Sequence, residues 1–198
     1  MIQSKDRSGW FGASDTAMIM GCWTTKTFAK WWLEKLGTAT RSFTTPAMQC
    51  GTAYEHRILD ALGVKEKDRQ IKIKRFLLRV NFDGTEKGMI TEVKTYSGEK
   101  FKLTKAYWMQ CQVEMFSSGY GFFRARKKCR IAAYRITEAE MENFFLPVDL
   151  SRLREYPIEY DARWVNEEYL PRLRYLVKCL KTGHWPKIEE MNDADTNN

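Results

Sequence analysis

The sequence predicts an α/β (α+β) domain in which a central mixed sheet is flanked by helices and followed by an extra C-terminal helix. Segments at residues 69–74, 76–83 and 88–95 alternate in polarity or are apolar, which is typical of consecutive strands. Helical patterns precede, interrupt and follow these strands. The chain shows no internal repeat and no second domain boundary, so we expect a single domain over residues 1–188.

Three helices are expected before the strands, over residues 14–20, 25–36 and 47–62. The second helix is followed by Gly37 and the third by Gly63. Glycine readily adopts the left-handed conformation that closes a helix, so both positions are natural ends.

After the strands the helical period returns over residues 103–117, and further strands are expected near 120–125 and 129–136. Thr137 and Glu140 form a capping-box pattern that opens another helix.

The C-terminal part is expected to hold a loop, marked by Pro147 and Pro157, and then a helix from Asp161 to Lys181. Pro171 should kink or divide that helix, because proline lacks a backbone N–H. The acidic and polar tail, residues 189–198, is predicted to be disordered.

Composition narrows the functional class. The chain has 198 residues, 43% of them apolar, and a net charge of +8, which favours a polyanionic partner such as nucleic acid or an acidic membrane surface. No apolar run approaches the ~20 residues that cross a bilayer, so we expect no membrane contact and a cytoplasmic location.

The five cysteines stand singly, which predicts buried thiols in a reducing compartment and no zinc site.

The most informative segment is residues 81–94, which reads as two short strands joined by a turn. Glu92 and Lys94 point to the same face of their strand, and an antiparallel partner can bring Asp83 beside them. Two carboxylates and one ammonium suit a divalent cation and the cleavage of a phosphodiester. The alternative is an ordinary hairpin with a solvated ion pair.

Two helical residues can complete such a site. Glu55 lies on the helix before the strands, where it is either a further oxygen ligand or a surface residue. Gln110 lies on the otherwise apolar helix after them, with Glu114 on the same face one turn later. A buried amide needs a partner, and a bound water would provide one.

The order of these motifs resembles the PD-(D/E)XK nucleases, and in detail the lambda-exonuclease or YqaJ-type viral recombination branch. The resemblance covers about residues 7–136 and implies a restriction-endonuclease-like core. The matching segments are Arg7 with Gly12-Ala13-Ser14, Gly51 with Tyr54-Glu55, Asp83-Gly84, Glu92-Val93-Lys94, and Ala106-Tyr107 with Gln110 and Gln112.

This resemblance implies a metal centre. Asp83 and Glu92 would bind Mg²⁺, with the Val93 carbonyl as a further ligand and Glu55 at the second of two ions; we expect Mn²⁺ to substitute for Mg²⁺. Lys94 would orient and activate the attacking water.

The resemblance also implies that Gln110 holds this water from the helix side, and that Arg7 and Ser14 bind a DNA 5′-phosphate. Asn81 stands where the relatives carry a small hydroxyl residue in the phosphate pocket, and Phe82 stands where the family name has proline.

The implied activity is a Mg²⁺-dependent DNA exonuclease that degrades duplex ends, 5′→3′, in phage-type recombination or DNA processing. The partners would be double-stranded DNA ends, two further copies in a homotrimer and a single-strand annealing protein, in the cytoplasm of a bacterial host. The alternatives are a structure- or sequence-specific endonuclease on the same fold and a non-catalytic DNA-binding protein. The sequence has no phosphate-binding glycine loop, so we expect no need for ATP.

Overall fold

The computed structural model describes residues 6–39, 45–121 and 127–195, and it confirms the mixed sheet flanked by helices. The five strands lie in chain order, and only β3 and β4 are parallel neighbours. The strands are β1 (Glu66–Ile73), β2 (Leu78–Glu86), β3 (Met89–Tyr96), β4 (Lys128–Arg135) and β5 (Leu153–Glu159).

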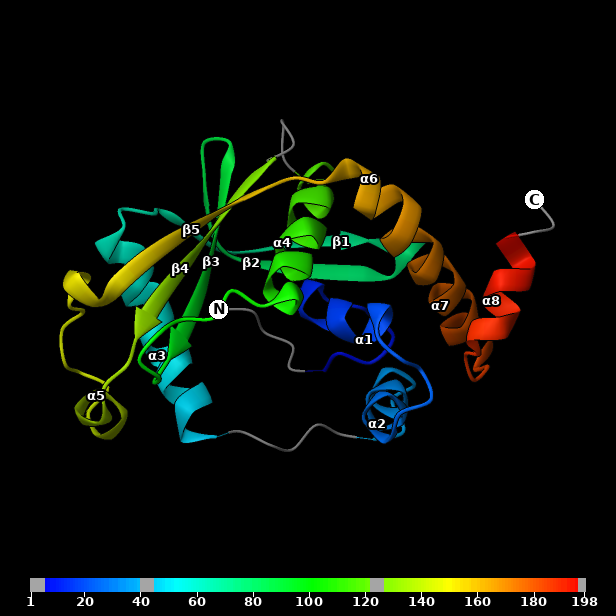
Figure 1. Ribbon diagram of the computed structural model, residues 1–198, viewed down its shortest axis with the longest axis horizontal. Coiled ribbons are helices and arrows are strands. Elements are labelled where there is room, and N and C mark those ends of the chain that lie inside the picture. Colours follow the sequence, from blue (N-terminus) through cyan, green and yellow to red (C-terminus); the bar gives the residue numbers. More distant parts are fainter. Residues whose placement is uncertain (1–5, 40–44, 122–126, 196–198) are drawn as a thin grey trace.

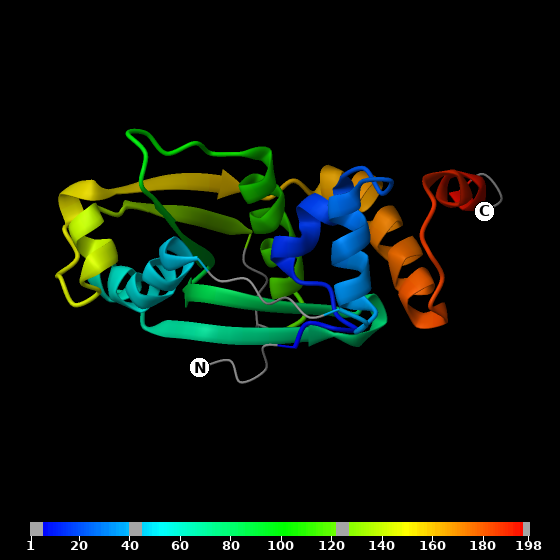
Figure 2. The same cartoon turned by 90° about the horizontal axis from the view of Figure 1, so that it is seen from below.

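The helices gather at the two ends of the sheet, and α4 (Lys105–Ser118) crosses its middle (Figures 1 and 2). Because parallel strands cannot be joined by a tight turn, α4 serves as the crossover from β3 to β4. One end carries α3 (Pro46–Ala61) and α5 (Glu138–Glu142). The other end carries η1 (Ala13–Asp15), α1 (Thr16–Met20), α2 (Lys26–Lys35) and α7 (Leu170–Thr182). Short 3₁₀ turns are η2 (Lys74–Phe76) and η3 (Leu150–Arg152).

The two faces of the sheet bury separate cores, because side chains alternate along each strand. Ile131 belongs to the larger core with residues of α4 and α7. The next residue, Ala132, belongs to the smaller core with Tyr54 and Ile58 of α3. Burial on both faces makes this sheet a rigid support for the side chains at its open edges.

The β2–β3 hairpin turns later than the sequence predicted. β2 continues through Asp83 and Gly84 to Glu86, and the turn is closed by Gly88 with a φ of 83°. Gly84 is therefore a strand residue. A Cβ there would lie 2.6 Å from a methyl carbon of Leu59, so its glycine lets α3 approach the sheet.

The strand β5 lies where the sequence predicts a loop, because prolines such as Pro157 are typical of loops. Pro157 lies within β5 opposite Arg130 of β4. β5 is an edge strand with a single neighbour, where proline is tolerated because its missing N–H faces away from the ladder. The strand predicted at 120–125 falls largely outside the described residues; Tyr120 and Gly121 lie in a turn.

The C-terminal region confirms that the helix expected over residues 161–181 is interrupted near Pro171. It consists of α6 (Ala162–Trp164), a π-helical turn η4 (Val165–Tyr169) and then α7. Pro171 explains the break, since its ring and missing N–H disturb the preceding turn. Residues 189–195 of the tail lie in α8 (Ile188–Asp195), where disorder was expected, and residues 196–198 lie outside the described residues. Ile188 and Met191 of α8 pack on the larger core.

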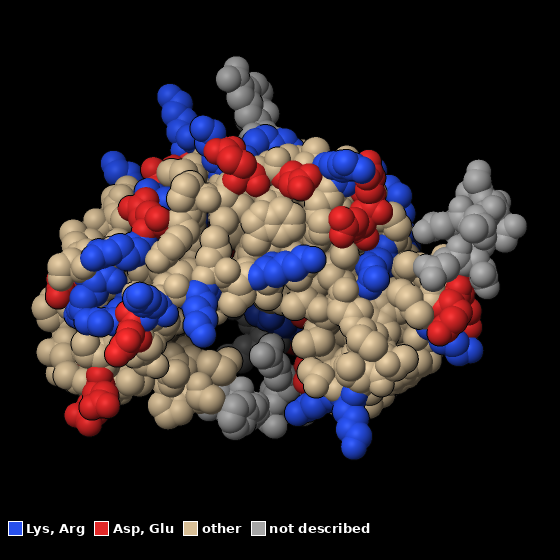
Figure 3. All heavy atoms as spheres, in the orientation of Figure 1, with Lys and Arg blue, Asp and Glu red and all other residues tan. Residues whose placement is uncertain are grey.

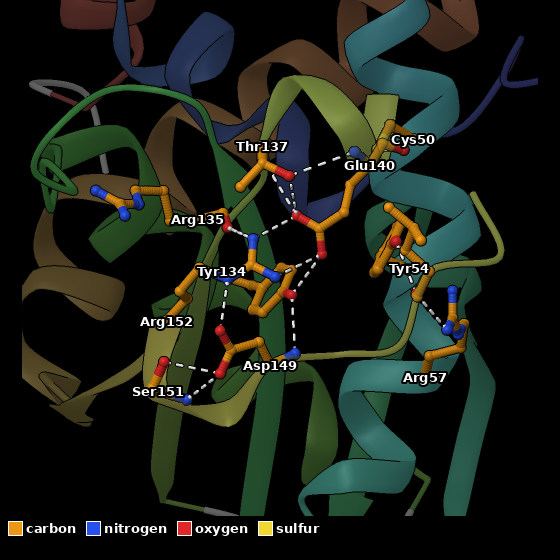
Figure 4. Close-up of polar contacts among 11 residues, drawn as sticks. Cys50, Tyr54, Arg57, Tyr134, Arg135, Thr137, Glu140, Asp149, Ser151 and Arg152 are labelled. Carbon is orange, nitrogen blue, oxygen red and sulfur yellow. Dashed lines mark hydrogen bonds and ion pairs between the residues drawn. The ribbon is translucent and has the colours of Figure 1, made fainter. Parts of the chain in front are cut away.

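A buried polar network fastens α5 to β4 and to the start of β5 (Figure 4). Glu140, 2% exposed, accepts hydrogen bonds from Arg152 Nη2 at 2.8 Å, Tyr134 Oη at 2.6 Å and the Thr137 N–H at 2.9 Å. Burial raises the pKa of Glu140, but the bonds from Arg152, Tyr134 and Thr137 outweigh it and bring the pKa to about 2.

This network predicts an acid-dependent loss of stability. Because the folded pKa of Glu140 is depressed below its ordinary value of 4.5, its stabilisation is complete above that value and is lost as the pH falls from 4.5 toward 2. Glu140→Gln should lower the free energy of unfolding by about 3 kcal/mol at pH 7. In urea unfolding, the difference from wild type should shrink below pH 4.5. Glu138→Gln, on the exposed side of α5, is the matched control. A difference independent of pH would contradict the network's role.

Candidate active site

A cavity of about 490 Å³ opens between α3 and the N-terminal helices, and the molecule is visibly hollowed there (Figure 3). Every site residue proposed from the sequence lines this one cavity, although the residues come from the N-terminal segment, α3, β2, β3 and α4. They are Arg7, Ser14, Glu55, Asn81, Asp83, Glu92, Val93, Lys94 and Gln110.

The cavity exists because β2 and β3 part from each other. Their pairing ends at Gly84 and Thr91. Further back along β2, the same edge is occupied by Phe11, whose N–H donates to the Leu77 carbonyl and whose carbonyl accepts from the Arg79 N–H, each at 2.8 Å. The stretch of β2 between these two contacts forms an open edge, and the cavity lies along it.

Asp83 lies where the strands separate. Its Oδ2 accepts the N–H of Val93 at 2.9 Å, in place of the ladder partner that β2 no longer supplies. The N–H and C=O of one strand residue face the same edge. The carbonyl of Val93 therefore faces the gap together with the Asp83 carboxylate.

Glu92 and Lys94 share one face of β3, as their spacing predicted, and meet Gln110 of α4. Lys94 Nζ donates to Glu92 Oε1 at 2.5 Å and to Gln110 Oε1 at 3.2 Å. Gln110 Nε2 donates to the same Glu92 oxygen at 2.5 Å. The three side chains form a closed ring of hydrogen bonds, which fixes their orientation.

Glu114 extends this ring into the core. Its Oε1 accepts from Gln110 Nε2 at 2.9 Å, and the side chain is fully buried. Its Oε2 has no hydrogen-bond partner among the described residues, and the thiols of Cys111 and Cys129 lie within 4.8 Å of its carboxylate. The sequence placed Glu114 on the face of Gln110 but assigned it no role; the four-residue spacing was the available signal.

Glu55 enters the cavity from α3, beside a pair that the sequence analysis missed. His56 Nε2 lies 2.9 Å from Asp68 Oδ2, and one ligand atom from each of the three residues falls within 4.8 Å of the others. Asp68 also lines the cavity and has a φ of 55°, a conformation unusual for a non-glycine residue. No sequence motif marks Asp68, because its position depends on the path of β1.

The far end of the cavity holds the polar groups expected to bind phosphate. Arg7 Nη1 donates to Ser14 Oγ at 3.3 Å. Asn81 Oδ1 accepts from Gln70 Nε2 at 2.8 Å. Arg79 lines the same end and was not predicted, since it lies outside the motifs.

The turn that carries Ser14 is fixed by a buried ion pair. Lys35 Nζ donates to Asp15 Oδ2 at 2.6 Å and to the Trp10 carbonyl at 3.0 Å. The same Asp15 oxygen accepts the Gly12 N–H at 2.7 Å. This arrangement holds the N-terminal segment against the sheet and sets the position of Ser14.

The order of motifs and the geometry agree with a family comparison. The family model of the YqaJ-like viral recombinase domain matches residues 4–121. The chain belongs to this family.

Solved structures of exonucleases share the fold of this YqaJ-like chain. The alkaline exonuclease LHK-Exo of Laribacter hongkongensis is 20% identical, with a TM-score of 0.59 over 89% of this chain and 94% of that chain. A phage-related exonuclease of Haemophilus somnus 129PT is 14% identical, with a TM-score of 0.63 over 92% and 96%. A putative exonuclease of Eubacterium rectale is 10% identical, with a TM-score of 0.56 over 92% and 85%.

No curated protein matches the sequence. Across the described parts of the chain, no helix combines the length and the apolar character needed to cross a membrane.

The electrostatics of this YqaJ-like site are dominated by crowded carboxylates. Burial, together with Glu92 and Glu55, raises the pKa of Asp83 well above its ordinary value. Burial and then Glu92 raise the pKa of Glu55 as well. Burial lowers the pKa of Lys94, but the adjacent Glu92 carboxylate outweighs this effect and raises it, so the amine is a cation at neutral pH. One ammonium does not balance the acids around it.

This imbalance predicts that the site destabilises the fold until a cation is bound. The folded pKa of Asp83 is raised, so its charged form costs stability at neutral pH. Asp83→Asn removes the charge and keeps an oxygen for the Val93 N–H. In EDTA it should raise the melting temperature by about 2–4 °C, the shift expected for ~1 kcal/mol in a chain of this size. Mg²⁺ should then stabilise wild type but not the variant. Glu142→Gln, at an exposed position of α5, should change neither the melting temperature nor its response to Mg²⁺; an equal effect there would contradict the interpretation.

Proposed function

We propose that this chain is a divalent-cation-dependent exonuclease that hydrolyses DNA from duplex ends in the 5′→3′ direction. The observation that supports it best is the convergence of Asp83, Glu92 and Lys94 in a cavity whose other end holds the Arg7–Ser14 pair. Membership of the YqaJ-like family and the exonuclease titles of the structural neighbours support the same activity. A homotrimer and a single-strand annealing partner, both implied by the family resemblance, remain part of this proposal.

The donor set suits a hard cation such as Mg²⁺ or Mn²⁺. Asp83, Glu92 and Glu55 offer carboxylate oxygens and Val93 offers a carbonyl, which are the ligands that these ions prefer. Burial, and then repulsion from Glu92, raise the pKa values of Asp83 and Glu55, and a bound cation would offset both effects. When bound, one or two such ions would neutralise phosphoryl charge and make water more acidic.

The remaining residues then have defined tasks. Lys94, as an ammonium, is held by Glu92 and Gln110 at the open edge of β2, where it can donate to an attacking water or to a phosphoryl oxygen. The Gln110 amide, fixed on its inner side by Glu114, keeps that ammonium in place. Attack by the water oxygen on phosphorus breaks the bond to the 3′-oxygen, and the new phosphate remains on the 5′ end of the shortened strand.

The Arg7–Ser14 pair would bind that 5′-phosphate. A guanidinium gives charge-assisted, paired hydrogen bonds to phosphate oxygens, and the Ser14 hydroxyl can donate another. Each round of hydrolysis creates a new 5′-phosphate, so such a pocket would favour repeated removal of nucleotides from one end. An endonuclease has no need of an end-binding pocket.

Catalysis is tested at Lys94. Lys94→Met keeps the aliphatic chain and removes the ammonium, so degradation of linear duplex DNA should fall by roughly 100- to 1000-fold. The variant should also melt at a lower temperature, because Glu92 loses its ion-pair partner, so the rates are compared at a temperature where circular dichroism shows both proteins folded. Lys105→Ala, an exposed cation at the start of α4, should leave the rate near wild type. EDTA should abolish wild-type activity, and Mg²⁺ or Mn²⁺ should restore it. Substantial activity in Lys94→Met, or in excess EDTA, would refute the proposed centre.

Exonuclease action is tested at Arg7. Wild type should degrade a duplex with 5′-phosphate ends faster than the same duplex with 5′-hydroxyl ends, and Arg7→Ala should abolish this preference by slowing only the phosphorylated substrate. Lys30→Ala, which removes an exposed cation from α2, should keep the preference. If the wild-type protein nicks closed circular DNA as readily as it degrades linear DNA, the chain is an endonuclease instead.

A further inference from the structure

The sheet face that carries Glu92 and Lys94 continues across β4 and β5 to a second cavity of about 410 Å³. Three aromatic residues line it together with three cations that belong to β4, β5 and the loop before α4. They are Tyr96, Phe101 and Tyr156, with Lys100, Arg135 and Arg154. We call these six residues the aromatic–arginine groove.

Strand register places this groove beside the catalytic residues. Lys94 lies opposite Ala133 of β4, and Ala133 lies opposite Arg154 of β5. Two residues further along β3, Tyr96 lies opposite Arg135 of β4. Residues in register project from the same face, and neighbouring strands are about 4.8 Å apart. The Arg154 backbone is therefore ~10 Å from that of Lys94, with only the small Ala133 side chain between them.

A series of ring contacts links the two cavities. Lys94 Nζ lies 5.2 Å from the centre of the Tyr107 ring. Tyr107 stacks on Phe101 with ring centres 5.8 Å apart and planes 4° from parallel. Phe101 in turn contacts Tyr156 at 5.1 Å and Tyr96 at 5.4 Å between ring centres. These partly buried rings therefore form a continuous row of contacts from Lys94 to Tyr156 and Tyr96.

The cations of the groove are available to an external anion. Lys100 and Arg135 form no ion pair with any described residue, and Arg154 donates only to the backbone carbonyls of Ser151 and Leu153. Arg152, at the same cavity, is committed to Glu140, whereas Arg135 points away from that network (Figure 4). Among the described residues that line this cavity, Glu99 is the one acid.

We propose that the aromatic–arginine groove binds single-stranded DNA that adjoins the phosphate held at Lys94. Single strands are bound by cationic grooves that follow the backbone and by aromatic rings on which exposed bases stack. A duplex keeps its bases paired and stacked inside, so it has no use for these rings. The inference rests on the proposed function, because the DNA strand is expected to part from its complement near the cleaved bond.

The cations are tested by a double charge reversal, Arg135→Glu with Arg154→Glu. The control is Lys178→Glu with Lys181→Glu, which reverses two exposed charges on α7, at the other end of the molecule. Binding of a labelled oligo-dT is measured by fluorescence anisotropy in EDTA, so that no cleavage occurs. The groove variant should bind at least tenfold more weakly. The slope of its log binding constant against log salt concentration should also be smaller in magnitude by about 1.4, which is 0.7 for each of two lost phosphate contacts. Equal losses in both variants would overturn the proposal, since they indicate general electrostatic attraction.

The rings are tested separately by Tyr156→Ala. Wild type should prefer oligo-dT to an abasic strand of the same length, and Tyr156→Ala should reduce this preference severalfold. Binding of a blunt duplex should be unchanged in Tyr156→Ala. If duplex affinity falls as far as single-strand affinity, the groove is a duplex-binding surface and the proposal is wrong.

Hydrolysis of bis-p-nitrophenyl phosphate separates a failure of the groove from a failure of the nuclease centre. This small diester needs only the Lys94 site, so the groove variants should cleave it at the wild-type rate. If wild type cleaves neither this diester nor DNA, the proposed function fails, while the binding comparison in EDTA still decides the groove.

Discussion

The hydrogen bond from the Val93 N–H to Asp83 is the interaction on which the site depends. It ends the β2–β3 ladder without leaving the Val93 N–H unpaired, because a side-chain oxygen takes the place of a backbone carbonyl. The same bond places a carboxylate at the mouth of the gap. Phe11 pairs with β2 on the other side of that gap, so the cavity is a space between two stretches of pairing along one strand edge.

The crowding of carboxylates in this cavity lowers the stability of the fold and suits the binding of a cation. Asp83, Glu55 and Glu114 all have raised pKa values, and burial is the first cause in each case. Glu92 is a further cause for all three, while Lys94 is the one ammonium within its hydrogen-bonding reach among the described residues. A site intended only to stabilise the fold would pair these acids with bases. Their repulsion instead prepares the cavity for a cation, as is common where function requires strained electrostatics.

The sequence predicted what depends on local pattern. Glu92 and Lys94 share a face because strand alternation requires it, and the helix carrying Gln110 follows from its apolar period. The sequence could not predict β5, because Pro157 carries a loop signal that only its edge position overrides. Asp68 and Arg79 were missed for a similar reason: each reaches the cavity through the tertiary path of β1 or β2, and no local motif records that path.

The family match covers the first three strands of the sheet and ends before the last two. The match ends at residue 121, so it contains every proposed catalytic residue but neither β4 nor β5. Those two strands extend the catalytic face of β3, and their register decides what lies beside Lys94. Ala133 next to it is small and fully buried, and Arg154 beyond it is an exposed cation. The proposed nuclease centre therefore lies within the matched segment, and the surface proposed for a DNA strand lies on the strands that follow it.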